Sequence, residues 1–239
     1  MSSKEKKINK GILDQLFFEV AKDYQKRTHR HGKGEIVVLG GAAIIAYYSF
    51  RAVSCDVDAV IDADSEIFES IRSVGERFNL DPTWLNDAFK QTESYSPKLV
   101  QYSMLYRTFC HCLSVRFVTG SYLVATKLKS FRPYRDMSDI AGIIFESKRQ
   151  GQPLTNESIH QAYRNLYGEE IVTLDPVIER FLQEVFAAKN VNGYYQSLVE
   201  QEAVNRETLV EIDKTESLKL HQMTNLEILQ KIKEKQGKK

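Results

Sequence analysis

Two acidic residues, Asp56 and Asp58, stand one residue apart in RAVSCDVDAVID (residues 51–62), a segment that otherwise has the composition of a buried strand. Side chains two positions apart in a strand point to the same face, so both carboxylates should project together. Burying unpaired carboxylates is costly, and two neighbouring ones also repel each other. A divalent cation would offset that cost, because Mg²⁺ prefers one or two carboxylates together with substrate phosphates as ligands. The spacing therefore predicts a site for Mg²⁺ or Mn²⁺ and a phosphorylated substrate.

Two glycines, Gly40 and Gly41, precede this acidic segment and separate the apolar run IVVL from AAIIAYYSF, which has the composition of a buried helix. A strand, a Gly-Gly turn and a helix in this order let backbone N–H groups approach an anion at the helix N-terminus. Each motif alone is weak evidence, since most Gly-Gly pairs are simple turns and Asp-x-Asp also occurs on exposed edge strands. The ordered set is more specific, because it continues into Arg-x-x-Ser-x-Asp-x-Asp over residues 51–58.

The elements that must position these residues follow from the spacing of the apolar side chains. Residues 12–24 carry a helical apolar face, and strands are expected over the segments 36–39, 53–61 and 110–118. A short helix is expected after residue 80, with Asp81 as its cap and Pro82 at its first position. These elements predict a mixed α/β arrangement around the acidic segment.

The helical pattern continues to the C-terminus without further strand signals. Residues 121–131 and 137–150 are expected as helices, joined by the basic turn RPYRD. From about residue 151 onward only helical periodicity is found. We therefore predict an α/β domain over residues 1–150 and a helical domain over residues 151–239.

The composition excludes several classes of protein. Of the 239 residues, 42% are hydrophobic and 27% charged, which is ordinary for a soluble globular protein. The formal net charge of +1 argues against a strongly basic surface that coats nucleic acid. Three cysteines make no even disulfide framework, and the longest apolar stretch is too short for a membrane span. A cytoplasmic location is therefore expected.

The segment VLGGAAIIAYYSFRAVSCDVDAVI resembles the glycine motif and metal-binding strand of the minimal nucleotidyltransferases, which are related to the catalytic fold of polymerase β. The resemblance continues in TWLNDAF and in YLVATKLKSFRPYRDMSDI. The latter is similar to the lysine helix and Arg-x-x-Asp-x-x-Asp motif of AbiEii-type toxin nucleotidyltransferases and their uncharacterised prokaryotic relatives. The resemblance covers about residues 36–145 and implies a small mixed sheet flanked by helices.

The resemblance also implies a function. It predicts a magnesium-dependent enzyme that transfers NMP from an NTP to a protein acceptor or an RNA acceptor such as tRNA. It further predicts the toxin of a toxin–antitoxin or phage-defence system, with a cognate antitoxin as partner. The site residues that it implies are Asp56 and Asp58 for the metal, Gly40 and Gly41 for the β- and γ-phosphates, Lys127 for the triphosphate, Arg51 and Ser54 at the opening of the site, and Asp136 and Asp139 as ion-pair partners orienting Lys127 or Arg135.

Two departures from the family pattern leave a second interpretation open. The second glycine is commonly a serine in this superfamily, and Gly41 has no hydroxyl to touch a phosphate. Many such enzymes also present a third carboxylate from a later strand, where residues 110–118 offer only Ser114 and Arg116 on the polar face. Either another acid such as Asp62 supplies the base, or the chain is a degenerate, non-catalytic member that binds nucleotide or acts as a regulatory partner.

Other residues that could do chemistry are better explained by packing. Cys110, His111 and Cys112 could suggest zinc, but strand side chains alternate and no second ligand pair has suitable spacing. We therefore expect core cysteines there. Trp84 and the tyrosine-rich residues 94–106 are expected to pack in the core rather than to stack on bases.

Overall fold

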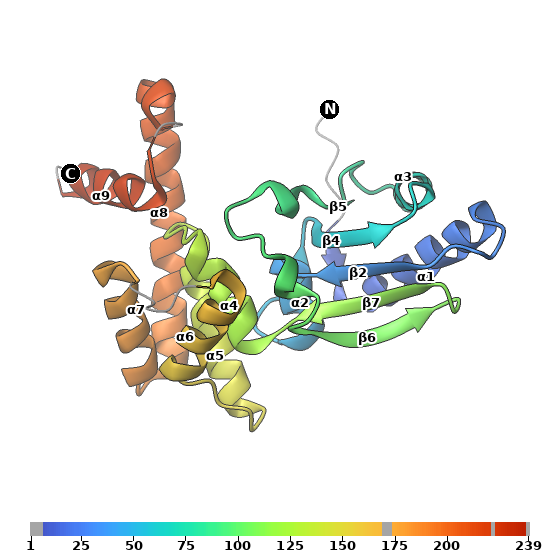
Figure 1. The fold of residues 1–239 in the computed structure, drawn as a ribbon. Helices are drawn as coiled ribbons and strands as arrows, with labels where there is room; N and C mark the ends of the chain where they lie inside the picture. Colours follow the sequence, from blue (N-terminus) through green and yellow to red (C-terminus); the bar gives the residue numbers. More distant parts are fainter. Residues whose placement is uncertain (1–6, 169–173, 221–222, 238–239) are drawn as a thin grey trace.

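The computed structural model describes residues 7–168, 174–220 and 223–237, and in these ranges a five-stranded sheet lies beside a group of helices (Figure 1). The strand order is β5-β4-β2-β7-β6, and a separate pair joins β1 to β3. The main strands are β2 (Gly34–Val38), β4 (Val57–Ala63), β5 (Leu85–Asn86), β6 (Ser103–Phe109) and β7 (Leu113–Val118); the short ones are β1 (Ile8–Asn9) and β3 (Val53–Ser54). The predicted small mixed sheet is confirmed.

Strand β2 is the centre of the sheet, since it pairs antiparallel with β4 and parallel with β7. Residues 36–38 are buried, as their β-branched composition predicts. The register places Val38 opposite Ala59, so the end of β2 meets the beginning of β4. There the Leu39 N–H donates to the carbonyl oxygen of Asp58 at 3.0 Å.

The helices fall into two groups along the chain. Helices α1 (Lys10–Arg27), α2 (Gly40–Tyr47) and α3 (Glu66–Phe78) belong to the sheet half, where α1 runs behind the sheet (Figure 1). The other group, at one end of the sheet, comprises α4 (Gly120–Lys129), α5 (Met137–Arg149), α6 (Asn156–Tyr167), α7 (Pro176–Ala187), α8 (Val191–Leu220) and α9 (Asn225–Gln236). None of the helices in the described ranges combines the length and the apolar character that crossing a membrane requires.

The single strand expected over residues 53–61 is wrong, because two strands occupy this segment. Cys55 and Asp56 connect β3 to β4. The two strands have different partners, since β3 pairs with β1 whereas β4 pairs with β2 and β5. Asp58 therefore lies in a strand, but Asp56 lies in the connection before it.

The helix expected after residue 80 is also wrong, because a turn, strand β5 and the 3₁₀ helix η1 (Ala88–Gln91) occupy the segment. The Asp81 side chain accepts the N–H of Thr83 at 2.7 Å and closes the turn. Trp84 is buried, and its indole N–H donates to the carbonyl oxygen of Ile71 at 3.0 Å. Strand pairing and burial of a large aromatic side chain outweigh the local helix signal here.

Strand β6 was not predicted, because it is an edge strand without a clear alternation. Residues 104–108 are all exposed, and the pairing with β7 shifts register between Leu105 and Arg107. Cys110 and His111 have positive φ angles of 48° and 55° and turn the chain into β7, so the strand expected over residues 110–118 begins only at residue 113.

One cluster of buried apolar side chains extends from the sheet into the helices and includes residues on both sides of residue 150. Leu123 of α4, Ile159 of α6 and Leu198 of α8 all belong to it. The sheet and these helices therefore share packing. The division into domains at residue 150 stays a prediction.

Candidate active site

A cleft of about 210 Å³ opens where β2 ends and β4 begins, and the last turn of α4 forms its opposite wall. The residues that line it come from five segments of the chain: Leu39, Gly40, Asp56, Asp58, Ala88, Phe89, Thr92, Ser94, Thr126, Lys127, Ser130, Arg132 and Arg135. The two aspartates of the sequence motif and the lysine of α4 therefore face one space.

The carboxylates of Asp56 and Asp58 form the acidic side of the cleft. Both residues are half-buried, and neither side chain has a hydrogen bond or ion pair to any other described residue. Burial, and after it the charge of Asp56, raises the pKa of Asp58 above its ordinary value. Arg135, Arg132 and Lys127 act in the opposite direction but do not cancel the rise. The fold thus holds two carboxylates together without a direct partner in the part of the chain that the structure describes.

The donor set fits a divalent cation that also binds substrate oxygens. Among the described residues, no group of three or more His, Cys, Asp or Glu side chains could enclose a metal ion by itself. Two carboxylates are nevertheless the usual protein contribution to a magnesium site that is completed by phosphate and water. Asp56 and Asp58 would hold such an ion at the start of β4.

Gly40 brings the N-terminus of α2 against this acidic pair. Its φ of +62° lies in the left-handed region, and a Cβ at this position would stand 2.9 Å from Asp58 Oδ2. The backbone conformation favours glycine, and a Cβ here would displace the Asp58 carboxylate. Leu39, the residue before the helix, provides no side-chain cap, so N–H groups of the first turn stay available beside the cleft.

Gly41 is small for a different structural reason. It is not among the residues that line the cleft, and a Cβ there would stand 2.5 Å from the hydroxyl oxygen of Ser54. Ser54 itself is buried in β3. The small size of Gly41 therefore allows α2 to pack against β3, and of the predicted glycine pair only Gly40 faces the cleft.

Lys127 is the centre of a buried ionic network behind the cleft. Only 7% of the residue is exposed, and its Nζ lies 3.0 Å from Asp136 Oδ1 and 2.9 Å from Asp139 Oδ2. Arg132 pairs with Asp136 at 2.9 Å, and Arg51 pairs with Asp139 at 3.0 Å. Three cations thus share two carboxylates, which leaves the network with an excess of positive charge beside Asp56 and Asp58.

The ionic network keeps Lys127 and Asp136 charged. Burial opposes the charge on Lys127, but Asp139 and Asp136 together raise its pKa above the ordinary value. Burial likewise opposes the charge on Asp136, yet Lys127 and Arg132 lower its pKa below the ordinary value. Lys127 is therefore an ammonium ion at neutral pH, oriented by the carboxylates of Asp136 and Asp139.

Of the arginines and the serine predicted at the site, Arg135 lies in the cleft, whereas Arg51 and Ser54 do not line it. Arg135 is exposed and lines the cleft, and it forms no ion pair with another residue in the described ranges. Arg51 and Ser54 are not among the described residues that line the cleft, and Arg51 is linked to the site by its ion pair with Asp139. Arg132 was missed by sequence reasoning, although its spacing of four residues from Asp136 in RPYRD could have suggested it.

No third carboxylate lines the cleft in the described part of the chain. On β7, Arg116 donates to the hydroxyl and carbonyl oxygens of Ser103, while Ser114 pairs with the Thr108 hydroxyl. Asp62 is four residues beyond Asp58, which at 3.3 Å per residue puts it about 13 Å along β4. The described residues therefore offer no acid that could act as a general base at this site.

Comparison with known proteins places this geometry in a family. Residues 15–163, more than half of the chain, match the family model described as "Nucleotidyltransferase of unknown function (DUF6036)". The matched residues include the whole cleft and its ionic network. Searches of the curated proteins and of the solved structures gave no match.

Proposed function

Since the chain belongs to this nucleotidyltransferase family, we propose that it is a metal-dependent enzyme that transfers NMP from an NTP to an acceptor hydroxyl. One observation carries the proposal: two carboxylates that have no partner among the described residues line the same cleft as Lys127, Arg132 and Arg135, at the N-terminus of α2. Carboxylates on one side and cations on the other suit a substrate that is a magnesium–triphosphate complex. The metal would bind the aspartate carboxylates, and the phosphates would bind the lysine and arginine side chains.

Each side of the cleft has a distinct task in this proposal. Asp56 and Asp58 hold Mg²⁺, which when bound neutralises charge that develops on the transferred phosphate. The first-turn N–H groups beside Gly40 bind phosphate oxygens. Arg135 is exposed in the cleft lining and binds the triphosphate from the solvent side, while Lys127 is held in place by its two ion pairs.

The transfer step is an in-line substitution at phosphorus. The acceptor hydroxyl oxygen bonds to the α-phosphorus, the bond from this phosphorus to the β-phosphate oxygen breaks, and pyrophosphate leaves. The hydroxyl proton passes to water, because no third carboxylate of the described chain lines the cleft. Lys127, which its ion pairs hold in place, stabilises the charge on the leaving pyrophosphate without having to move.

The resemblance to AbiEii-type toxins supports an RNA or protein acceptor and a toxin role with a cognate antitoxin. A toxin of this kind should arrest growth on expression, and the arrest should require both Asp56 and Asp58. Expression of the Asp56→Ala/Asp58→Ala chain at the same level is the matched comparison.

The transfer itself is tested by incubating the protein with labelled NTPs, Mg²⁺ and candidate RNA or protein acceptors. The wild type should label an acceptor, whereas Asp56→Ala/Asp58→Ala should not. Asp62→Ala is the control, because Asp62 is an exposed carboxylate on the same strand, outside the cleft. Equal labelling by the double variant and the wild type would contradict the catalytic assignment.

A second candidate function follows from the missing third carboxylate. A chain with the metal pair but without a base could bind Mg²⁺–NTP and act as a regulatory partner without turnover. Calorimetry separates the two functions: nucleotide binding that depends on Asp56 and Asp58, without transfer to any acceptor in a broad panel, would favour the binding protein.

A further inference from the structure

A second cleft, of about 480 Å³, adjoins the candidate active site. Ser130 lines both clefts, and the hydroxyl of Ser94 donates to that of Ser130 at 2.8 Å. Thr92 and Ser94 line the first cleft, whereas Glu93 between them lines the second. The two spaces are therefore neighbours across a wall made of two short segments.

The first cleft is too small to hold a complete NTP. Pockets for complete small-molecule ligands usually measure about 300–1,000 Å³. The first cleft, at about 210 Å³, lies below this range, and the second, at about 480 Å³, lies within it. The first cleft has the charges that a metal–triphosphate group requires, so the nucleoside must extend beyond it.

The second cleft has the mixed lining that a nucleoside requires. Ile178, Met223 and Leu226 contribute apolar surface to it. Glu93 and Asn225 contribute polar groups, and the Asn225 amide N–H that donates to the Ser130 carbonyl oxygen leaves the amide oxygen to accept from a ligand. A flat heterocycle between apolar side chains, with polar groups at its edge, suits this combination.

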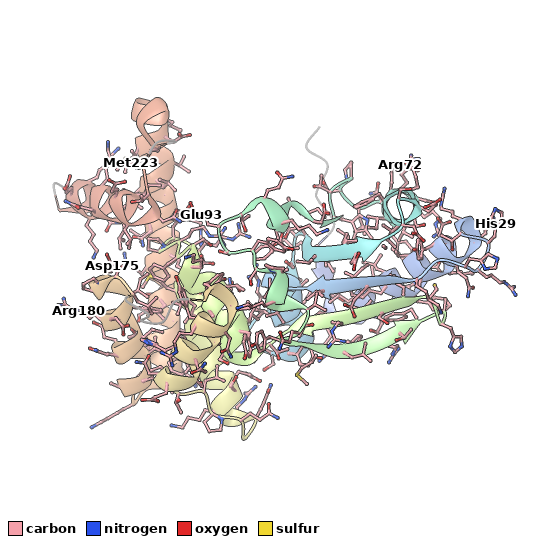
Figure 2. The ribbon with its side chains drawn as sticks, viewed as in Figure 1. His29, Arg72, Glu93, Asp175, Arg180 and Met223 are labelled. Atoms are coloured by element: carbon pink, nitrogen blue, oxygen red, sulfur yellow. The ribbon has the colours of Figure 1, made fainter. Side chains whose placement is uncertain are left out.

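Glu93 argues for a ribose rather than a nucleic-acid chain at this place. It is exposed, and in the described ranges its carboxylate has no hydrogen bond or ion pair. Figure 2 shows Glu93 on the side of the sheet half that faces the helices, with Met223 on the helical side. Sugar hydroxyls can donate hydrogen bonds to such a carboxylate, whereas phosphate groups offer it no donor.

We propose that the second cleft binds the nucleoside of the NTP whose triphosphate occupies the first cleft, with Glu93 accepting hydrogen bonds from the ribose hydroxyls. This inference rests on the proposed function, because it assumes a triphosphate between Asp58 and Arg135. It makes the enzyme selective for ribonucleotides over deoxyribonucleotides.

The test is calorimetric titration of the full chain, in Mg²⁺, with the four NTPs, the four dNTPs and inorganic tripolyphosphate. At least one NTP should bind the wild type about tenfold or more tightly than tripolyphosphate, since hydrogen bonds to a charged group contribute at this level. Met223→Trp, which fills the second cleft, should remove this advantage and leave tripolyphosphate binding unchanged. Met104→Trp is the matched control, because Met104 is 56% exposed on β6 and lines neither cleft.

A second variant covers the outcome in which Met223→Trp does not fold. Glu93→Ala changes an exposed side chain, and it should bind the NTP and its 2′-deoxy counterpart equally, whereas the wild type should prefer the ribonucleotide. Equal binding of both nucleotides by the wild type, or an undiminished preference for the ribonucleotide in Glu93→Ala, would overturn the assignment of Glu93.

The outcomes separate this inference from the function on which it rests. If neither an NTP nor tripolyphosphate binds, the proposed function fails. If both bind with equal affinity, the first cleft is supported and the nucleoside assignment alone is overturned. Unchanged NTP affinity in Met223→Trp, with reduced transfer, would assign the second cleft to the acceptor and would also overturn the inference.

Discussion

Asp58 is a carboxylate whose ionisation the fold opposes. Burial and the neighbouring Asp56 raise its pKa, and in the described ranges no cation contacts it directly. The folded state therefore takes up a proton at a higher pH than the unfolded chain. Above the folded pKa the charged group reduces stability, and as pH falls below it, towards the ordinary value of 3.8, the penalty disappears.

Asp58→Asn should therefore make the ligand-free protein at least as stable as the wild type near neutral pH, and the difference should vanish in acid. The measurement is urea unfolding at about pH 7 and at about pH 4. A variant that is markedly less stable at neutral pH would show that the carboxylate is structural, held by contacts that oppose this reasoning.

Asp136 is the opposite case, because its neighbours favour its ionised form. Its lowered pKa means that its contribution to stability is present above the ordinary value of 3.8 and is lost as pH falls through the folded pKa. Asp136→Asn should reduce the free energy of unfolding at neutral pH by about 3–5 kcal/mol, since it leaves Lys127 and Arg132 short of a buried partner.

Urea unfolding at neutral pH checks the Asp136 prediction. Glu76→Gln is the control, because Glu76 pairs with Arg72 on the exposed face of α3 and its loss should change stability little. A similar effect of the two substitutions would contradict the buried network as a major source of stability.

At the scale of the element, the N-terminus of α2 depends on one backbone conformation. Gly40 combines a left-handed φ with close approach to Asp58, so the helix can begin directly beside the acidic pair. The first-turn N–H groups and the metal ligands then lie at one end of β2 and β4.

Gly40→Ala should cost about 1–2 kcal/mol for the left-handed backbone, and it should also displace the Asp58 carboxylate and weaken Mg²⁺–NTP binding. Gly151→Ala is a matched control, since Gly151 has a φ of +77° and open space around its Cβ position. Both variants should lose stability, but only Gly40→Ala should lose the rise in melting temperature with Mg²⁺ and NTP. The same loss in Gly151→Ala would separate nucleotide binding from the contact with Asp58.

At the scale of the whole molecule, α8 supports the basic turn that carries the cleft arginines. Asn205 donates its amide N–H to the carbonyl oxygen of Pro133 at 3.0 Å, and Arg206 donates to that of Tyr134 at 3.0 Å. Glu202 accepts the Ser138 N–H at 2.8 Å, which caps the start of α5. Helix α8 thus supports a wall of the site whose residues lie 64 to 72 positions earlier in the chain.

Asn205→Ala should destabilise the protein by about 1–3 kcal/mol, because it leaves the buried Pro133 carbonyl without its partner. It should also weaken NTP binding, since Pro133 lies between Arg132 and Arg135. Thermal unfolding and nucleotide titration check both effects, with Gln196→Ala on the exposed side of α8 as control. Unchanged nucleotide affinity in Asn205→Ala would show that the turn is positioned without α8.

The sequence by itself predicted the parts of the site that depend on local chemistry. Periodicity and the order of the motifs located β2, α2 and the Asp-x-Asp segment, because these signals lie close together in the chain, whereas the lysine of α4 was implied by the family resemblance. The resemblance likewise implied Asp136 and Asp139 as ion-pair partners of Lys127 or Arg135, and the structure contains an ion pair of each with Lys127. The roles of these residues in catalysis stay predictions.

Only the tertiary structure decided which distant segments meet. Arg51 was predicted at the opening of the site, but it pairs with Asp139, 88 residues away, behind the cleft. Ser94 and Ser130 lie 36 residues apart and form the wall between two clefts, which no local pattern indicates. Asp56 lies outside the strand because β3 and β4 pair with different partners. Such contacts arise from the packing of whole elements, and periodicity reports only which face of an element is buried, not what covers it.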